Sequence, residues 1–171
     1  MDLLDFEGEA LYFDDPPPEN VTVLLAAAAD AYGQGESELP LLQAYFFAPE
    51  HLMVIVALYR FFYYQHRYPE TLIVAERALT LVGRRLHFPD QWSALTPDDL
   101  LGENKPMSLI RFYLLALKGA AYVCLRLGQL ENGKAMVEKI LELDPEDRLN
   151  ASVLKNVLDE ATRLRLVVSN P

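Results

Sequence analysis

A short segment bounded by glycine and proline, residues 128–145, most constrains what this chain can fold into. Gly128 interrupts the apolar pattern before it, and the proline after Asp144 disfavours helix at that aspartate, so a helix must start and stop inside the segment. Gly133 is small enough for another helix to approach closely. Apolar residues recur on one helical face, at Val137, Ile140 and Leu141. The segment therefore predicts the second helix of a helical hairpin.

The preceding segment, residues 114–127, supplies a matching first helix. Ala120 and Ala121 place small side chains where two paired helices must come close together. The apolar face of this helix continues at Leu117, Cys124 and Leu127. Residues 114–145 therefore predict one complete hairpin.

This hairpin resembles the tetratricopeptide repeat (TPR), a helix–turn–helix unit of about 34 residues. In the frame of that family Leu117 holds the large position, the two alanines hold the tight-contact positions, and Gly128 forms the turn. Two residues depart from the pattern. Cys124 stands where an aromatic residue is usual, and Ile140 stands where a small residue is usual.

Two upstream copies extend the resemblance, at residues 52–83 and 21–48. In the first of them Tyr68 fills the aromatic turn position and Ala78 a small position. Tyr59 is oversized where alanine or glycine is normal, so we expect it to displace the neighbouring helix. The resemblance implies an all-α fold, a TPR-like stack of about three antiparallel helical hairpins plus a C-terminal capping helix.

Capping residues and prolines set the predicted helix boundaries. Asn20 and Ser37 are expected to cap the first two helices. The last helix is expected to carry one apolar stripe and to close the stack with its polar face. The predicted helices span residues 20–32, 37–48, 49–66, 69–86, 106–127, 131–143 and 146–167.

The predicted organisation has two parts: an acidic, proline-ended tail at residues 1–19 and a single helical-repeat domain at residues 20–171. An irregular insert at about 87–105 separates the two clearest hairpins. Long loops in compact domains often carry function. Trp92 lies in this insert, where it either packs the loop onto the body or contacts a partner.

The tail concentrates the acidity of the chain. Residues 1–20 carry seven acidic residues and no basic one, in a chain of net charge −10. Leucine, phenylalanine and tyrosine are interleaved with these acids. The tail is therefore either a disordered solubilising segment or a docking segment. In the second case residues 1–13 would occupy a groove of the same chain or of a dimer partner.

Charge and composition exclude several classes of partner. So acidic a chain should be repelled by nucleic acid and by anionic membrane surfaces. The most apolar stretch is interrupted by proline and charge, so no membrane span is expected. A single cysteine allows no internal disulfide and fits a cytoplasmic location.

Motifs for chemistry are missing from the sequence. His51, His66 and His87 lie far apart and lack the spacing of a zinc site. Cys124 lies within an apolar face, where cysteine usually acts as a small hydrophobe. We therefore expect no catalytic residues, no cofactor, no metal and no enzymatic activity.

A binding groove is instead implied by the TPR resemblance, because the first helices of TPR hairpins line a concave surface. The expected groove residues are apolar, aromatic and basic, and tyrosine and arginine are enriched at binding hot spots. Their alternative is to pack against one another or against the last helix. The groove positions carried over are Met53, Val56, Arg60, Tyr63, Tyr64, Leu115, Lys118, Tyr122 and Arg126.

These features favour a non-enzymatic protein–protein interaction module. The expected role is a small chaperone or adaptor that binds a peptide segment of a client protein, with a weaker resemblance to TPR-type chaperones of type III secretion. One alternative is an accessory assembly factor for a multi-subunit or metal-containing enzyme. Another is a structural homodimer whose groove is filled by its own N-terminal tail.

Overall fold

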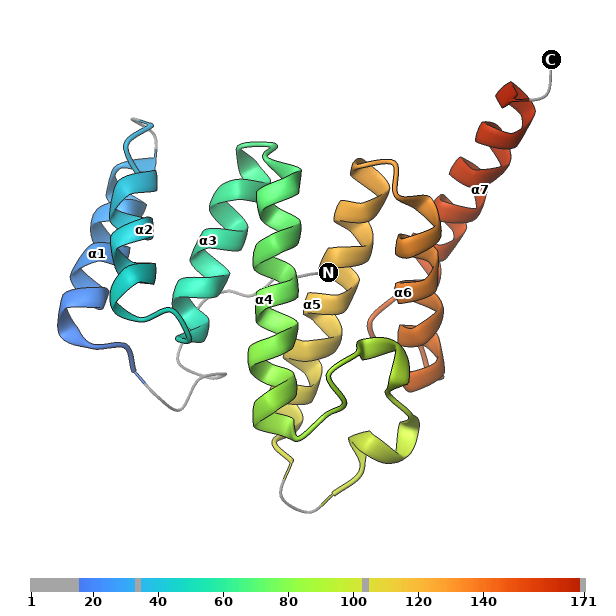
Figure 1. The fold of residues 1–171 in the computed structure, drawn as a ribbon, viewed down its shortest axis with the longest axis horizontal. Helices are drawn as coiled ribbons and strands as arrows, with labels where there is room; N and C mark the ends of the chain where they lie inside the picture. Colours follow the sequence, from blue (N-terminus) through green and yellow to red (C-terminus); the bar gives the residue numbers. More distant parts are fainter. Residues whose placement is uncertain (1–15, 33–34, 103–104, 170–171) are drawn as a thin grey trace.

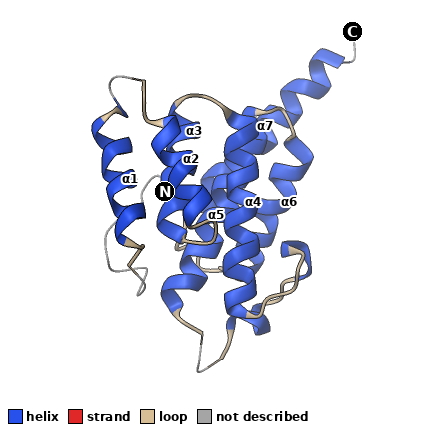
Figure 2. Cartoon of the chain, turned by 60° about the vertical axis from the view of Figure 1, so that its left-hand side comes forward, coloured by secondary structure: helices blue, strands red, loops and turns tan. Residues whose placement is uncertain are grey.

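The computed structural model describes residues 16–32, 35–102 and 105–169. This part of the chain is all-α and contains no strand (Figures 1 and 2). Two short 3₁₀ helices, η2 (Trp92–Ala94) and η3 (Pro97–Leu100), lie between α4 and α5. The α-helices are α1 (Glu19–Asp30), α2 (Glu38–Phe47), α3 (Leu52–Tyr64), α4 (Tyr68–Leu86), α5 (Met107–Arg126), α6 (Leu130–Leu143) and α7 (Ala151–Ser169).

Successive helices pack as hairpins, α1 with α2, α3 with α4 and α5 with α6. The hairpins stack through contacts between α2 and α3 and between α4 and α5, and α7 packs on α6 (Figure 1). The expected all-α architecture of three antiparallel hairpins and a terminal helix is therefore the observed one.

Helix α5 forms the centre of the stack. Its residues from Phe112 to Ala121 are all buried. By length and composition α5 could cross a membrane, but 72% of its apolar window is buried inside the stack. Its apolar composition is therefore that of a core helix.

The close contact expected at Gly133 is confirmed. A Cβ atom at this position would lie 3.0 Å from the backbone oxygen of Ala121 and 3.2 Å from a methyl carbon of Leu158. Gly133 thus lets α6 approach α5 and α7 together. Gly128 has a φ of 73°, the left-handed conformation that ends α5 and that glycine adopts without a steric penalty.

Tyr59 is fully buried on α3, where a small residue was expected. Gly119 of α5 has no side chain and leaves room for the Tyr59 ring. The large and small positions are exchanged between the two helices.

The predicted cap at Asn20 is wrong, and the predicted cap at Ser37 is right in position but not in bonding. Helix α1 begins at Glu19, with Pro18 as its N-cap, so Asn20 lies inside the first turn. Ser37 does precede α2, but its side chain makes no capping hydrogen bond. In α1 the amides of Val21 and Thr22 both donate to the Pro18 carbonyl, at 2.9 Å each.

The last helix starts five residues later than predicted, at Ala151 rather than residue 146. Asp147 lies before it with a φ of 49° and accepts hydrogen bonds from the backbone amides of Ala151 (2.6 Å) and Ser152 (3.2 Å). Asp147 therefore caps α7 from a preceding turn.

The apolar stripe of α7 is only half buried. Leu154 and Leu158 pack into the core, whereas Val153, Val157 and Leu164 are exposed. The capping helix thus presents apolar as well as polar side chains on its outer surface.

The insert folds back against α4 and α6 (Figure 1). Leu95 is fully buried, and the Lys139 amine on α6 donates a hydrogen bond of 2.9 Å to its carbonyl. Thr96 caps η3, since its amide and hydroxyl each donate to the Asp99 carboxylate at 2.8 Å. Lys105 lies 5.0 Å from the centre of the Phe88 ring.

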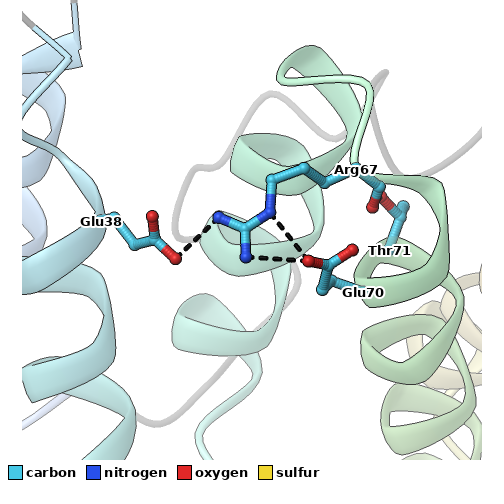
Figure 3. Close-up of polar contacts among 4 residues, drawn as sticks. All are labelled: Glu38, Arg67, Glu70 and Thr71. Carbon is cyan, nitrogen blue, oxygen red and sulfur yellow. Dashed lines mark hydrogen bonds and ion pairs between the residues drawn. The ribbon is translucent and has the colours of Figure 1, made fainter.

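Arg67 joins the first two hairpins (Figure 3). Its Nη1 donates to the Glu38 carboxylate on α2 at 2.7 Å, and its Nε donates to the Glu70 carboxylate on α4 at 2.9 Å. The Arg67 carbonyl accepts a hydrogen bond of 2.8 Å from the buried Thr71 hydroxyl. The guanidinium also lies 4.6 Å from the centre of the Phe62 ring. We call this group the Arg67 clamp.

Candidate functional site

Four tyrosines form a continuous line across the first helices of the three hairpins. Tyr32 follows α1 and meets Tyr64 of α3 edge-on, with ring centres 6.5 Å apart. Tyr64 contacts Tyr63 at 5.7 Å, and Tyr63 contacts Tyr122 of α5 at 5.9 Å. These are distances typical of favourable aromatic pairs. We call these four residues the tyrosine row.

An arginine ends the tyrosine row. The Arg126 guanidinium donates a hydrogen bond of 3.2 Å to the Tyr122 hydroxyl and lies 4.6 Å from the centre of the Tyr68 ring. The hydrogen bond to Tyr122 raises the pKa of Arg126. The tyrosine row therefore ends in a cation held over an aromatic face.

A cleft with a volume of about 490 Å³ opens beside Tyr32 and Tyr64, between α3 and the first hairpin. Small side chains create it, because Ala28 and Ala29 of α1 face Ala57 of α3 where larger residues would close the gap. We call this space the apolar cleft. Its lining residues are Leu25, Ala28, Ala29, Tyr32, Ser37, Leu41, Ala57, Arg60, Phe61 and Tyr64.

Ser37 places an unsatisfied hydroxyl in the apolar cleft. The residue is 1% exposed, and its Oγ has no hydrogen-bond partner within the described part of the chain. A buried polar group without a partner costs about 1–3 kcal/mol of stability. An unpaired buried group of this kind calls for a structural or functional explanation.

The structure brings five of the predicted groove residues to this surface. Arg60 and Tyr64 line the apolar cleft, and Tyr63, Tyr122 and Arg126 continue the tyrosine row.

Three other predicted groove residues belong to the core. Val56 and Leu115 are buried at 5% and 3% exposure. Lys118 is also buried, and its amine donates a hydrogen bond of 2.6 Å to the Leu149 carbonyl in the turn before α7. Leu115 and Lys118 are buried because α5 packs against α4, α6 and α7, and Val56 lies on the buried side of α3, so none of the three lines an open groove. Met53 is half-buried at the start of α3, away from the described cleft.

Several residues of the site were not predicted from the sequence as groove residues, among them Tyr68 and Ser37. Tyr68 was assigned only a turn role, yet its ring contacts Tyr63 at 6.2 Å and stacks on Arg126. Ser37 was assigned a capping role, yet it lines the apolar cleft. The high density of tyrosine over residues 59–68 was the signal that could have identified Tyr68. Nothing in the sequence indicates that the Ser37 side chain makes no capping hydrogen bond.

Trp92 is half-buried and packs against the core. It also lines a separate cavity of about 420 Å³ between the insert and α4, beside Arg84 and Asp90. Trp92 therefore packs onto the helical body, which was one of its two expected placements.

The titratable groups of the described residues include no set suited to metal binding, since no three His, Cys, Asp or Glu residues gather there. Burial raises the pKa of the Cys124 thiol to about 11, with a smaller contribution from Glu76. Burial also raises the pKa of Tyr113 to about 12. The candidate site instead presents aromatic rings and guanidinium groups.

Comparison with known proteins identifies one relative. The chain is 47% identical over 161 residues to an uncharacterized 19.8 kDa protein in the nifW 5' region of Azotobacter chroococcum mcd 1. The match covers 94% of this chain and 90% of that protein. No protein-family model matches the chain, and no solved structure matches it.

Proposed function

This chain belongs to the family of the uncharacterized 19.8 kDa protein of Azotobacter chroococcum mcd 1, and we propose that it is a non-enzymatic protein–protein interaction module. It acts as a small cytoplasmic chaperone or adaptor that holds a peptide segment of a client protein. The observation that supports this most is the tyrosine row beside the apolar cleft.

The residue types of this surface suit polypeptide recognition. Tyrosine and arginine carry a large share of binding energy at protein interfaces. Tyr32 and Tyr64 are 44% and 49% exposed, so each ring still offers nearly half of its surface to a partner. Their edge contact holds the two rings in place before binding and reduces the entropy lost on complex formation.

The expected client segment is partly apolar and partly acidic. An apolar side chain would enter the apolar cleft, and the tyrosine row would contact the neighbouring residues of the segment. Arg60 lies at the cleft and Arg126 at the other end of the row, so carboxylates on the segment would meet a cation at either end.

A TPR-like repeat remains our proposal for the ancestry of the hairpins. The left-handed Gly128 and the tight packing at Gly133 support it, because both features occupy the positions that the repeat pattern gives them. The insert between α4 and α5 and the exchange of Tyr59 with Gly119 set this family apart from a regular array.

The genetic position of the relative favours a second, more specific role. That protein is encoded in the nifW 5' region, beside a nif gene. We propose as an alternative that this chain is an accessory assembly factor for a multi-subunit or metal-containing enzyme among the nif gene products. A structural homodimer is the third candidate, which light scattering of the purified chain would reveal.

The test is affinity purification from the native cell, under conditions that induce nif genes, followed by quantitative mass spectrometry. The wild-type chain is compared with a Tyr64→Ser/Tyr122→Ser variant. Phe46→Ser is the matched control, because Phe46 is an 81% exposed aromatic residue outside the tyrosine row.

A partner retained by Phe46→Ser and lost from the double variant supports the proposal. That partner is then titrated in purified form against all three proteins. Equal affinity for the wild type and the double variant would contradict a binding site at the tyrosine row.

A further inference from the structure

The apolar cleft is large enough to hold an aromatic side chain together with part of its neighbouring chain. Its volume of about 490 Å³ lies within the range of about 300–1,000 Å³ that is typical of ligand pockets. Most of its lining is apolar, and Tyr32 and Tyr64 flank its opening. The unpartnered Ser37 hydroxyl lies among these apolar residues and lacks a hydrogen-bonding group that an incoming backbone could supply.

The acidic tail carries a matching segment in residues 3–7, Leu-Leu-Asp-Phe-Glu. These residues lie outside the part of the chain that the structure describes. Phe6 is flanked by Asp5 and Glu7, so a phenylalanine inserted in the cleft would place two carboxylates near its rim. Arg60 supplies the positive charge there.

The reach of the tail favours Phe6 over Phe13. The cleft extends to Tyr32, about 20 Å along the helix axis from Glu19, at about 1.5 Å per residue. An extended chain spans about 3.3 Å per residue, so from Glu19 Phe6 reaches about 43 Å and Phe13 about 20 Å. Phe6 can therefore arrive at the Tyr32 end of the cleft with slack, whereas Phe13 would need a fully extended chain, and only Phe6 has a carboxylate on both sides.

We propose that residues 3–7 of this chain dock in its own apolar cleft, with Phe6 between α1 and α3 and its flanking carboxylates at Arg60. The tail then blocks the site until a client displaces it. This inference rests on the proposed function, because it assigns an internal occupant to the same surface.

The experiment places a photoreactive benzoylphenylalanine at position 6 of the full-length chain. After irradiation and Glu-C digestion, mass spectrometry should locate the cross-link within residues 25–32 or 57–64 of the same molecule. A second protein carries the probe at position 13 and should give no cross-link to residues 32 or 64. Cross-links from position 6 that lie only outside the cleft would overturn the proposal.

Two alanines on α1 provide a matched pair of variants. Both Ala26 and Ala29 are exposed, but only Ala29 lines the cleft. Ala29→Leu fills the cleft and should lower the position-6 cross-link about tenfold, equivalent to about 1.4 kcal/mol of docking free energy. Ala26→Leu should leave the yield unchanged, and equal yields from the two variants would contradict docking in the cleft. Tyr64→Ser is a second cleft variant, to be used if Ala29→Leu alters the circular dichroism spectrum.

Two further outcomes are distinguishable. Cross-linked dimers whose yield rises with protein concentration would show that a second copy supplies the tail, which contradicts docking within one chain. Binding of a client is measured separately, as described for the tyrosine row. A missing cross-link with intact client binding would overturn only the docking of the tail, and the opposite result would overturn only the proposed function.

Discussion

Tyr59 of α3 and Gly119 of α5 fit one another so closely that a Cβ atom at position 119 would lie 2.7 Å from the Tyr59 hydroxyl oxygen and 3.3 Å from its Cζ atom. Tyr59 is fully buried, so its ring has no solvent into which it can move. The contact fixes how closely the second and third hairpins approach.

We predict that Gly119→Ala destabilises the protein. Overpacking costs about 1–3 kcal/mol, and the gain in helix propensity returns about 1 kcal/mol. The net loss in the free energy of unfolding should reach up to about 2 kcal/mol, measured by urea titration.

A double-mutant cycle with Tyr59→Phe tests the cause. Removing the hydroxyl group relieves the shortest contact, so Gly119→Ala should cost less in the Tyr59→Phe background than in the wild type. Gly133→Ala is the control, because its nearest neighbour is the backbone oxygen of Ala121, which Tyr59→Phe does not remove. Strict additivity of Gly119→Ala and Tyr59→Phe would refute the proposed contact.

Lys118 should act on stability and not on binding. Lys118→Met removes the buried donor to the Leu149 carbonyl, and an acceptor left without its partner costs about 1–3 kcal/mol. Lys134→Met is the matched control, since Lys134 forms a more exposed ion pair with Asp159 and should have a smaller effect. If a Lys118→Met protein is folded but has lost affinity for the client, Lys118 belongs to the binding site.

The helices are predictable from the sequence because their ends and close contacts are set by nearby residues. Gly128 and the prolines determine helix ends, and the small residues of the hairpins allow close packing. Gly133 illustrates this, since a missing side chain is needed wherever two helices come this close. The start of α7 is harder to predict. Asp147 and Asn150 both adopt positive φ and extend the preceding turn, a conformation that these residue types tolerate but do not require.

The site is only partly predictable, because burial depends on distant contacts. Tyr63, Tyr64 and Tyr122 are correctly grouped, since they lie near the ends of equivalent helices. Lys118 is misplaced because its partner is Leu149, 31 residues away in a turn whose path the sequence does not specify. The apolar cleft requires knowledge of how far α1 lies from α3.

Cys124 should react with thiol reagents only when the protein unfolds. The residue is 1% exposed, and burial raises its pKa to about 11, so little reactive thiolate is present at neutral pH. As the only cysteine of the chain, it gives an unambiguous signal with a chromogenic disulfide reagent. The labelling rate in increasing urea should follow the unfolding transition. Fast labelling of the native protein would show that α5 is accessible from solvent.

Asp147 should make stability depend on pH in the acid range. Its hydrogen bond with the Ser152 side chain, followed by bonds with backbone amides, holds the pKa of this carboxyl below its ordinary value of 3.8. The stabilisation is therefore fully present above the ordinary pKa, and it is lost as the pH falls through the folded pKa.

Asp147→Asn keeps a residue that tolerates positive φ and retains one acceptor for the α7 amides, but it removes the charge. The variant should have a lower melting temperature than the wild type at pH 6. The difference should begin to shrink below pH 3.8, where the unfolded chain becomes protonated, and it should keep shrinking until the pH falls through the lower pKa of the folded protein. A constant difference from pH 6 to pH 2.5 would exclude the carboxylate charge as the cause.

The Arg67 clamp should control the mobility of the first hairpin (Figure 3). Helices α1 and α2 each bury only two residues, namely Val21, Ala28, Leu41 and Ala44. With so little apolar contact, the bond from Arg67 to Glu38 is an important tie between α2 and α4. Arg67→Gln should therefore increase hydrogen exchange several-fold in α1 and α2 and leave α5 and α6 unchanged.

Arg163→Gln is the control for a lost surface charge, because Arg163 pairs with Glu160 within α7 and joins no two hairpins. High salt should reproduce part of the Arg67→Gln effect in the wild type, since the clamp is partly exposed and is screened by ions. Uniform exchange across all helices in Arg67→Gln would mean that the arginine stabilises the whole stack. Exchange confined to α1 and α2 would mean that the clamp restrains the first hairpin in particular.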